Sequence, residues 1–428
     1  MLYNAPRGTR DILPDETRRW QYVEAKFRSV CDRFAYEEIR IPTFEHTEVF
    51  LRSVGETTDV VQKEMYTFED KSGRSLTLRP EGTAGVARSF IEQGMSSNPY
   101  PVRLYYLLNL FRYERVGKGR YREFNQFGIE AFGSVEPDMD VEVIALADLF
   151  FAELGLERRL HVNSIGCPEC RGEYQKLLYE YYLPHAAELC PDCQQRLERN
   201  PLRLIDCKVE SCRAISRSAP RLLDYLDEDC RVHFDRVLEL LRSLGIDYTI
   251  DKDIVRGLDY YTKTVFEFVS ENVGTQGTIC GGGRYDTLIE TMGGEAVPGV
   301  GFALGVERLL MELEAQGCLP QLTQYPDLFI ALQTEAAGAA AAGLALELRR
   351  RGLRVVSEVC GRSLRAQLKQ ADRSAARWVL VLGGNELETS SAELRQMESG
   401  ERLTVNWRDA ASVRQVIEAD VRQDIEEN

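Results

Sequence analysis

Residues 111–130 (FRYERVGKGRYREFNQFGIE) and 255–268 (VRGLDYYTKTVFEF) indicate the fold most directly. In the first stretch, two alternating patterns flank a short loop with two glycines, which is typical of a β-hairpin. In the second, one arginine and two adjacent tyrosines precede another alternating pattern. Strands that follow one another through hairpin-length links favour an antiparallel sheet.

Further β and helical patterns surround these two stretches. Short β patterns occur at residues 38–44, 64–68, 75–78, 102–112, 124–133, 159–165, 248–250, 264–269, 277–280 and 300–302. Apolar residues at helical spacing predict helices at residues 17–36, 83–92, 140–154 and 304–315. Pro42 interrupts the first β pattern, and it favours equally an edge strand of a monomer or a subunit boundary.

Changes of pattern along the chain predict two domains. Residues from about 167 to 235 turn to short charged helices rich in cysteine, arginine and leucine, which we interpret as an inserted helical module. Residues 319–326 have the polar, proline-bearing character of a linker. Beyond them β and α patterns alternate, as in a small α/β domain. We therefore expect a first domain at 1–325, with the insertion, and a second at 326–428.

Composition limits the possible functions. The chain has 428 residues, of which 44% are hydrophobic, and its formal net charge of -15 argues against a protein that coats nucleic acid indiscriminately. Its N-terminal stretch lacks an apolar signal core, and the longest apolar run, residues 336–346, is too short to span a bilayer. We expect a soluble, cytoplasmic protein with no membrane partner.

Eleven cysteines without a secretion signal favour reduced thiols or a metal site over a disulfide framework. Six of them have suggestive spacing, with two CxxC pairs followed by two further cysteines, and they are Cys167, Cys170, Cys190, Cys193, Cys207 and Cys212. This spacing suits tetrahedral zinc, and packed or exposed free thiols are the alternative. The four histidines are scattered without paired spacing, so we assign them no chemistry.

Cations concentrate in the loop of the predicted hairpin, at Arg112, Arg115, Lys118, Arg120 and Arg122. A planar guanidinium group can donate two parallel hydrogen bonds to phosphate oxygens, so the loop could bind a triphosphate or an RNA end. A solvated charged hairpin gives the same pattern. The following strand places Phe124, Gln126, Gly128 and Glu130 on one face. Such a face suits stacking on a flat base and hydrogen bonding to a small polar ligand.

These stretches together resemble the histidyl-tRNA synthetases, a family of class II aminoacyl-tRNA synthetases. The resemblance extends to residues 6–16 (PRGTRDILPDE), 77–88 (TLRPEGTAGVAR), 280–286 (CGGGRYD) and 298–310 (PGVGFALGVERLL). It implies an α+β catalytic domain with an antiparallel sheet, a helical insertion and a C-terminal α/β anticodon-binding domain. It also implies that histidine and ATP, with Mg²⁺, give histidyl-adenylate, and that histidine then moves to the 3′-terminal adenosine of tRNA(His). The segment around Pro42 resembles the motif through which members of the family form homodimers.

The resemblance also implies roles for individual residues. The histidine site would comprise Glu81, Thr83, Gln126, Glu130, Tyr260, Tyr261 and Tyr285. The ATP site would comprise Arg112, Glu114, Arg120, Phe124 and Arg308. Arg256, together with Arg112, would stabilise charge at the reacting phosphorus, and tRNA contacts would come from Arg115, Lys118, Arg362 and Arg365. The resemblance assigns no metal-ligating residue.

Two other classes of protein share parts of this pattern. One is the regulatory, synthetase-like subunit of ATP phosphoribosyltransferase, which keeps the fold without the charging activity. The intact stretch at 256–268 and the C-terminal domain count against it. The other is a noncatalytic RNA-binding module, and histidine-dependent pyrophosphate exchange would distinguish an enzyme from both.

Overall fold

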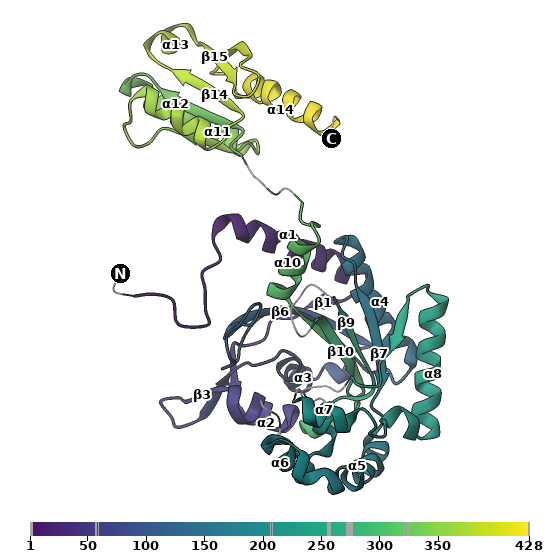
Figure 1. The fold of residues 1–428 in the computed structure, drawn as a ribbon. Helices are drawn as coiled ribbons and strands as arrows, with labels where there is room; N and C mark the ends of the chain where they lie inside the picture. The colour runs from purple at the N-terminus through teal and green to yellow at the C-terminus, as the bar shows by residue number, and fades with distance from the viewer. Residues whose placement is uncertain are drawn as a thin grey trace. The chain divides into compact units, whose positions relative to one another are not determined.

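The computed structural model describes residues 3–55, 58, 60–205, 207, 209–254, 258–270, 277–320, 322 and 325–426. The chain divides into two compact units, Met1–Pro320 and Gln321–Asn428. Figure 1 shows their elements, and each unit is described by itself below. Within the described residues, every helix is too short or too polar to cross a bilayer.

An eight-stranded sheet forms the centre of the first unit (Figure 1). Its strands run in the order β1 (Glu37–Glu38), β5 (Val102–Phe111), β6 (Glu123–Phe132), β11 (Gly299–Gly305), β10 (Thr278–Arg284), β9 (Thr262–Val269), β7 (Arg159–Ser164) and β8 (Tyr248–Ile250). The six inner strands are antiparallel to their neighbours, whereas β1 and β8 pair in parallel at the two edges. The predicted antiparallel sheet is therefore confirmed, with parallel strands added at its edges.

Helices cover one face of this sheet and leave part of the other for a cavity. The covering helices are α1 (Pro14–Arg33), α4 (Pro137–Glu153), α8 (Glu228–Ser243) and α10 (Val306–Ala315). Phe27 of α1 is buried against the rings of Tyr105, Phe127 and Phe302. Because side chains alternate along a strand, Gln126 and Tyr106 point to the opposite face. There α3 (Thr83–Glu92) and α9 (Leu288–Thr291) pack beside Tyr106 in a second core.

The single strand expected at residues 38–44 is wrong, because the chain changes sheets within it. Residues Glu37–Glu38 form β1, whereas β2 (Phe44–His46) joins a separate three-stranded sheet with β4 (Ser75–Leu78) and β3 (Tyr66–Glu69). Between them, the carbonyl groups of Ile41 and Pro42 accept hydrogen bonds from the Arg79 guanidinium at 2.7 and 3.1 Å. Backbone groups that would have formed a ladder are thus satisfied by a side chain. Helix α2 (Thr47–Val54), absent from the sequence-based prediction, follows β2.

The insertion is helical, as expected, and has a small core of its own. It contains α5 (Pro168–Tyr182), α6 (Pro191–Arg199) and α7 (Glu210–Ser216), joined by short 3₁₀ turns. Tyr174, Leu178 and Tyr182 pack there with buried cysteines. Helix α8 follows, and its Phe234 and Val237 belong to the main core instead.

The second unit is a five-stranded mixed sheet with helices. The strand order is β13 (Val355–Ser357), β12 (Leu328–Leu332), β14 (Trp378–Leu382), β15 (Ser391–Gln396) and β16 (Arg402–Asn406). The first three are parallel and the last two antiparallel. The helices are α11 (Gly338–Arg350), α12 (Leu364–Arg373), α13 (Gly384–Thr389) and α14 (Ala410–Glu426). This confirms the α/β domain, and β15, β16 and α13 add to the elements predicted from the sequence.

Candidate active site

A cavity of about 810 Å³ opens on the uncovered face of the main sheet. Most of the residues predicted for the histidine site line it, and these are Glu81, Thr83, Gln126, Tyr260 and Tyr261. Arg112 and Arg308 lie on the same wall. Residues far apart in the sequence therefore meet at one concave site, which is where a small ligand would bind.

Glu81 lies at the start of α3 and is almost completely buried, with 4% of its surface exposed. Its carboxylate accepts hydrogen bonds from the backbone amides of Thr83 at 2.9 Å and Ala84 at 2.6 Å. Helix N-terminal amides favour a negative charge, but burial still raises the pKa of Glu81 above its ordinary value. An incoming cation such as an amino group would relieve that penalty.

Glu130 lies beneath the aromatic part of the cavity and is 1% exposed. It accepts hydrogen bonds from the hydroxyl groups of Thr83 at 2.7 Å and Tyr106 at 3.1 Å, and from that of Tyr285. Burial raises the pKa of Glu130 to about 8, although the three hydroxyl donors act in the opposite direction. Three hydroxyl donors therefore hold the carboxyl group in position.

Two glycines make room for this arrangement. A Cβ atom on Gly301 would lie 2.3 Å from a carboxylate oxygen of Glu130 and 2.9 Å from the Tyr285 hydroxyl. A Cβ atom on Gly128 would lie 2.3 Å from the ring of Tyr106. Neither distance is compatible with a side chain, so the glycines in β6 and β11 are required by the site.

Three tyrosine rings form the wall above Glu130. The centroid of the Tyr260 ring lies 4.7 Å from that of Tyr261 and 5.6 Å from that of Tyr285. Tyr260 and Tyr261 line the cavity, whereas Tyr285 and Glu130 lie behind this lining. The result is a pocket with an aromatic wall and a buried carboxyl group behind it, which suits a flat ring that also carries hydrogen-bonding atoms.

A smaller cavity of about 200 Å³ adjoins the first and shares Arg112, Gln126 and Arg308 with it. The residues predicted for the ATP site, Glu114, Arg120 and Phe124, complete its lining. The guanidinium of Arg112 is 5.5 Å from the centroid of the Phe124 ring, and its Nε donates to the carbonyl group of Pro80 at 2.7 Å. Three guanidinium groups beside an aromatic ring are suited to a nucleotide triphosphate.

All three of these arginines have neighbouring polar groups that orient them. The Arg308 Nη1 atom donates to the carbonyl group of Thr278 at 3.1 Å, and burial lowers the pKa of Arg308. The carboxylate of Glu114 lies 3.8 Å from Arg112 and 3.9 Å from Arg120. The adjoining cavity therefore has a positively charged wall of defined geometry.

The residues predicted to contact tRNA are exposed within their own units. Arg115 and Lys118 are exposed on the loop between β5 and β6, and Arg362 and Arg365 are exposed in the second unit. The guanidinium of Arg122 lies on the ring of Tyr113, 3.7 Å from its centroid, so it is not part of the positively charged wall of the adjoining cavity. Arg256 lies outside the residues that the structure describes.

Sequence reasoning missed two features of the site. Tyr106, fully buried, donates to Glu130, and the signal for it is a polar ring at a core position of an alternating strand. Residues of the insertion also line the larger cavity, and these are Ile205, Cys207, Arg213, Ser216, Arg217 and Arg221. No local pattern could connect them with Glu81, because they are more than a hundred positions away in the sequence.

Comparisons with known proteins agree with this geometry. The sequence model of a family described as histidyl-tRNA synthetase matches residues 8–169 and 183–309, and that of an anticodon binding domain matches residues 327–415. A histidine--tRNA ligase of Acetivibrio thermocellus is 56% identical over 95% of this chain and 98% of its own length. One from Caldicellulosiruptor saccharolyticus is 51% identical over 95% of this chain and 97% of its own length.

Solved structures give the same answer. The crystal structure of apo histidyl-tRNA synthetase from S. aureus is 39% identical, with a TM-score of 0.82, and the alignment covers 98% of this chain and 99% of that one. A structure described as an ATP phosphoribosyltransferase regulatory subunit/histidyl-tRNA synthetase, from Bacillus halodurans, is more distant, with 25% identity and a TM-score of 0.65 over 90% of this chain and 99% of that one. The chain belongs to the histidyl-tRNA synthetase family of class II aminoacyl-tRNA synthetases.

Proposed function

We propose that the protein activates histidine with ATP to give histidyl-adenylate and then transfers histidine to the 3′-terminal adenosine of tRNA(His). The observation that carries this proposal is the position of Glu130, a buried carboxyl group under a wall of tyrosines, beside an adjoining cavity lined by arginines. Relatives that are named histidine--tRNA ligases and match nearly the whole chain support it.

In the proposed complex the histidine ring occupies the aromatic pocket. Tyr261 and Glu130 bond the two imidazole nitrogens, with Tyr260 and Tyr285 packed around the ring. An analogue that lacks those nitrogens would leave buried polar groups unpaired, and such a site discriminates strongly against it. Glu81 and Thr83 accept the α-amino group, and Gln126 orients the α-carboxylate.

ATP occupies the adjoining cavity. Phe124 stacks on the adenine, Arg112 contacts the α-phosphate and Arg308 the γ-phosphate, with Glu114 and Arg120 beside them. Carboxylate oxygens suit Mg²⁺, which proteins usually bind through one or two carboxylates together with substrate phosphates. Glu267 lines the larger cavity and Glu114 the smaller one, and these two carboxylates would hold the Mg²⁺ ion. The ion would neutralise charge on the phosphates.

The reaction requires no nucleophile from the protein. A carboxylate oxygen of histidine attacks the α-phosphorus, the bond to the β-phosphate oxygen breaks, and pyrophosphate leaves. In the second step a hydroxyl group of the terminal adenosine attacks the acyl carbon and AMP leaves. Positioning and stabilisation of the developing negative charge suffice for both steps. We assign that stabilisation to Arg112 and, from the sequence, to Arg256.

Histidine-dependent exchange between pyrophosphate and ATP, measured without tRNA, tests the proposal. We expect exchange with histidine and none with phenylalanine, which has a ring of similar shape without the nitrogens. A regulatory subunit or a noncatalytic RNA-binding module would give no exchange, and that result would exclude the proposed activity. Addition of tRNA(His) should then yield histidyl-tRNA.

We further propose that the enzyme is a cytoplasmic homodimer. Pro42 follows the edge strand β1, and two nearby aromatic side chains, Phe44 and Phe68, are 51% and 44% exposed while their rings contact each other. Exposed aromatic pairs of this kind are common at protein interfaces. Light scattering should give twice the mass of one chain, and the double variant Phe44→Glu, Phe68→Glu should give a monomer.

A further inference from the structure

Seven of the eleven cysteines lie in or next to the insertion, and six of them occur in pairs at the starts of helices. Cys167 is the residue before α5 and Cys170 lies in its first turn, and Cys190 and Cys193 have the same positions in α6. Cys207 precedes α7, and Cys212 lies in its first turn. The seventh, Cys230, lies in the first turn of α8, which Asp227 precedes. With the exception of Cys207, these groups thus lie near helix N-terminal amides, which favour negative charge.

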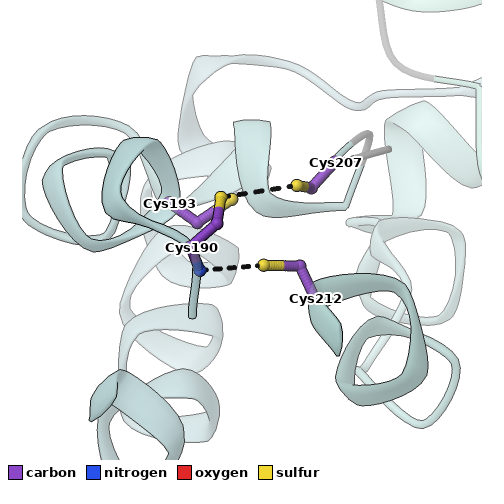
Figure 2. Close-up of side chains that lie close together, drawn as sticks. All are labelled: Cys190, Cys193, Cys207 and Cys212. Atoms are coloured by element: carbon purple, nitrogen blue, oxygen red, sulfur yellow. Dashed lines mark hydrogen bonds between the residues drawn. The ribbon is translucent and has the colours of Figure 1, made fainter. Parts of the chain in front are cut away.

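The first cluster consists of Cys190, Cys193, Cys207 and Cys212, whose sulfur atoms all lie within 4.8 Å of one another (Figure 2). The sulfur atoms of Cys190 and Cys207 are 3.8 Å apart. Two thiolates bound to one tetrahedral zinc at about 2.3 Å each would lie about 3.8 Å apart, whereas a disulfide requires about 2.0 Å. The backbone amide of Cys190 also donates to the sulfur of Cys212 at 3.2 Å.

A second cluster has a related composition, and its residues lie before and after those of the first cluster in the sequence. Cys167, Cys170, Cys230 and Asp227 place their ligand atoms within 4.8 Å of one another. The sulfur atoms of Cys167 and Cys170 are 3.6 Å apart, and one oxygen of Asp227 lies 3.1 and 3.0 Å from them. The backbone amide of Asp227 donates to the sulfur of Cys170 at 3.2 Å, and the other carboxylate oxygen accepts from the amide of Cys230 at 2.7 Å.

We propose that the insertion binds two structural zinc ions, one through Cys190, Cys193, Cys207 and Cys212, and one through Cys167, Cys170, Cys230 and Asp227. Both sets offer four ligands, which closes a tetrahedral site and leaves no position for a substrate. Soft thiolates also select zinc over magnesium or calcium. Both ions would therefore stabilise the fold and take no direct part in catalysis.

The alternative, packed free thiols, explains the arrangement less well. The remaining cysteines, Cys31, Cys280, Cys318 and Cys360, belong to neither cluster, so burial alone does not gather thiols in this chain. Groups of four ligands, by contrast, form twice within one small module. A short helical segment with a small core is also the kind of structure that a metal commonly stabilises.

The first zinc site would also fix one side of the large cavity. Cys207 lines that cavity, and so do Arg213, which follows Cys212 in α7, and Arg217, the residue after this helix. Arg203, just before Cys207, pairs with Asp259 at 3.1 Å, in the segment that leads to Tyr260. Loss of this ion should therefore alter the position of two cations that face the substrate.

Metal analysis of the full chain tests the proposal directly. The protein is produced with added zinc, purified without chelator, and passed through a column containing a weak chelator to remove loosely bound ions. We expect two zinc ions per chain, with an X-ray absorption shell dominated by sulfur at about 2.3 Å. Zinc-free protein, or zinc bound mainly by nitrogen and oxygen, would overturn the proposal.

Paired variants assign the ions to their clusters. One double variant carries Cys190→Ser and Cys193→Ser, and another carries Cys167→Ser and Cys170→Ser. Each should retain one zinc ion per chain. The control is a double variant of two cysteines outside the clusters, Cys318→Ser and Cys360→Ser. It should retain both zinc ions. A cluster variant that keeps both ions would refute the site it removes.

A measurement on the unaltered protein covers the case in which a variant fails to fold. Thiol alkylation followed by peptide mapping should show the seven cluster cysteines protected, and a strong chelator should expose them while zinc is released. Exposed Cys360 should react from the start. Equal reactivity of the cluster cysteines with and without the chelator would contradict metal binding.

Discussion

The Tyr285 hydroxyl donates a hydrogen bond to Glu130, and the two side chains meet across β11 at a position where a side chain on Gly301 could not fit. Tyr285 follows β10 and Glu130 belongs to β6, so the bond joins two strands that are separated by a third in the sheet. This contact fixes the base of the proposed histidine pocket.

Replacing Glu130 with glutamine should weaken histidine binding selectively. The amide keeps the volume of the side chain but places an NH₂ donor where a carboxyl oxygen accepts, and a buried group left without its partner costs about 1–3 kcal/mol, or roughly a 5- to 140-fold change in affinity. We expect the KM for histidine in pyrophosphate exchange to rise accordingly, with the KM for ATP unchanged. Glu123→Gln, at the exposed start of the same strand, is the control. Equal effects of both variants would remove Glu130 from the site.

The same carboxyl group should make stability depend on pH. The pKa of Glu130 is about 8 in the folded chain, against an ordinary value of 4.5. Between these values the folded state keeps a proton that the unfolded state has released, so the free energy of unfolding should fall as pH rises. Glu130→Gln removes this contribution, and its stability relative to the parent should increase from about pH 5 to about pH 8 in denaturant titrations. A difference that stays constant with pH would disprove the assignment.

The buried ion pair of Asp140 and Arg284 should contribute strongly to the stability of the fold. Both side chains are 0% exposed, and Nε of Arg284 lies 3.0 Å from Asp140. Burial alone would raise the pKa of Asp140, but the Arg284 guanidinium and the His233 side chain together outweigh burial and lower it to about 2. Asp140→Ala leaves Arg284 paired with Asp286 at 3.1 Å but removes its fully buried partner, and the loss of one partner of a buried pair costs about 3–5 kcal/mol. Asp70→Ala, which breaks the more exposed pair with Arg74, should cost much less in the same denaturant titration. Similar losses in both variants would contradict this role.

The extent to which the fold follows from the sequence depends on how local the determining contacts are. The bounds of β4 and α3 agree with prediction because Pro80 and Gly82 separate a short alternating strand from a helical pattern. The division of residues 38–44 was not predictable, since it depends on Arg79 reaching the carbonyl groups of Ile41 and Pro42. A guanidinium that bonds backbone nearly forty residues away leaves no periodic signal.

The site shows the same division. Glu81, Gln126 and Glu130 could be named because they lie in long ordered motifs that resemble a known family. Asp227 could not, because its position beside Cys170 arises from the approach of α8 to α5 across 57 residues. CxxC spacing alone therefore identifies half of each cysteine cluster, and folding supplies the rest.

Arg256 should affect chemistry far more than ATP binding. Its role is inferred from the sequence, since it lies outside the described residues. Removing a group that stabilises charge in a transition state typically reduces the rate by about 10²–10³-fold. We expect Arg256→Ala to slow adenylate formation by this order in single-turnover assays while ATP affinity changes little. Arg115→Ala, on the exposed loop, should leave the adenylate step intact and impair only transfer to tRNA. Unchanged adenylate formation in Arg256→Ala would refute its role.

The exposed cations of α12 should bind tRNA without contributing to activation. Arg365, Lys369 and Arg373 recur every four residues, so they form one exposed stripe along the helix. Arg362 is less suitable, because its guanidinium lies 3.6 Å from Glu358 and bonds Gln370.

Changing the three stripe residues to alanine should raise the Kd for tRNA(His) and lower its dependence on salt, because fewer phosphate counterions are released. Pyrophosphate exchange should be unchanged, since the stripe belongs to the second unit. Arg402→Ala, on β16 of the same unit and paired with Glu393 at 3.2 Å, is the matched control. Loss of phosphate contacts made by α12 must change the salt dependence of tRNA binding. If the triple variant bound tRNA with the same affinity and salt dependence as the parent, the stripe would not be the RNA surface of this unit.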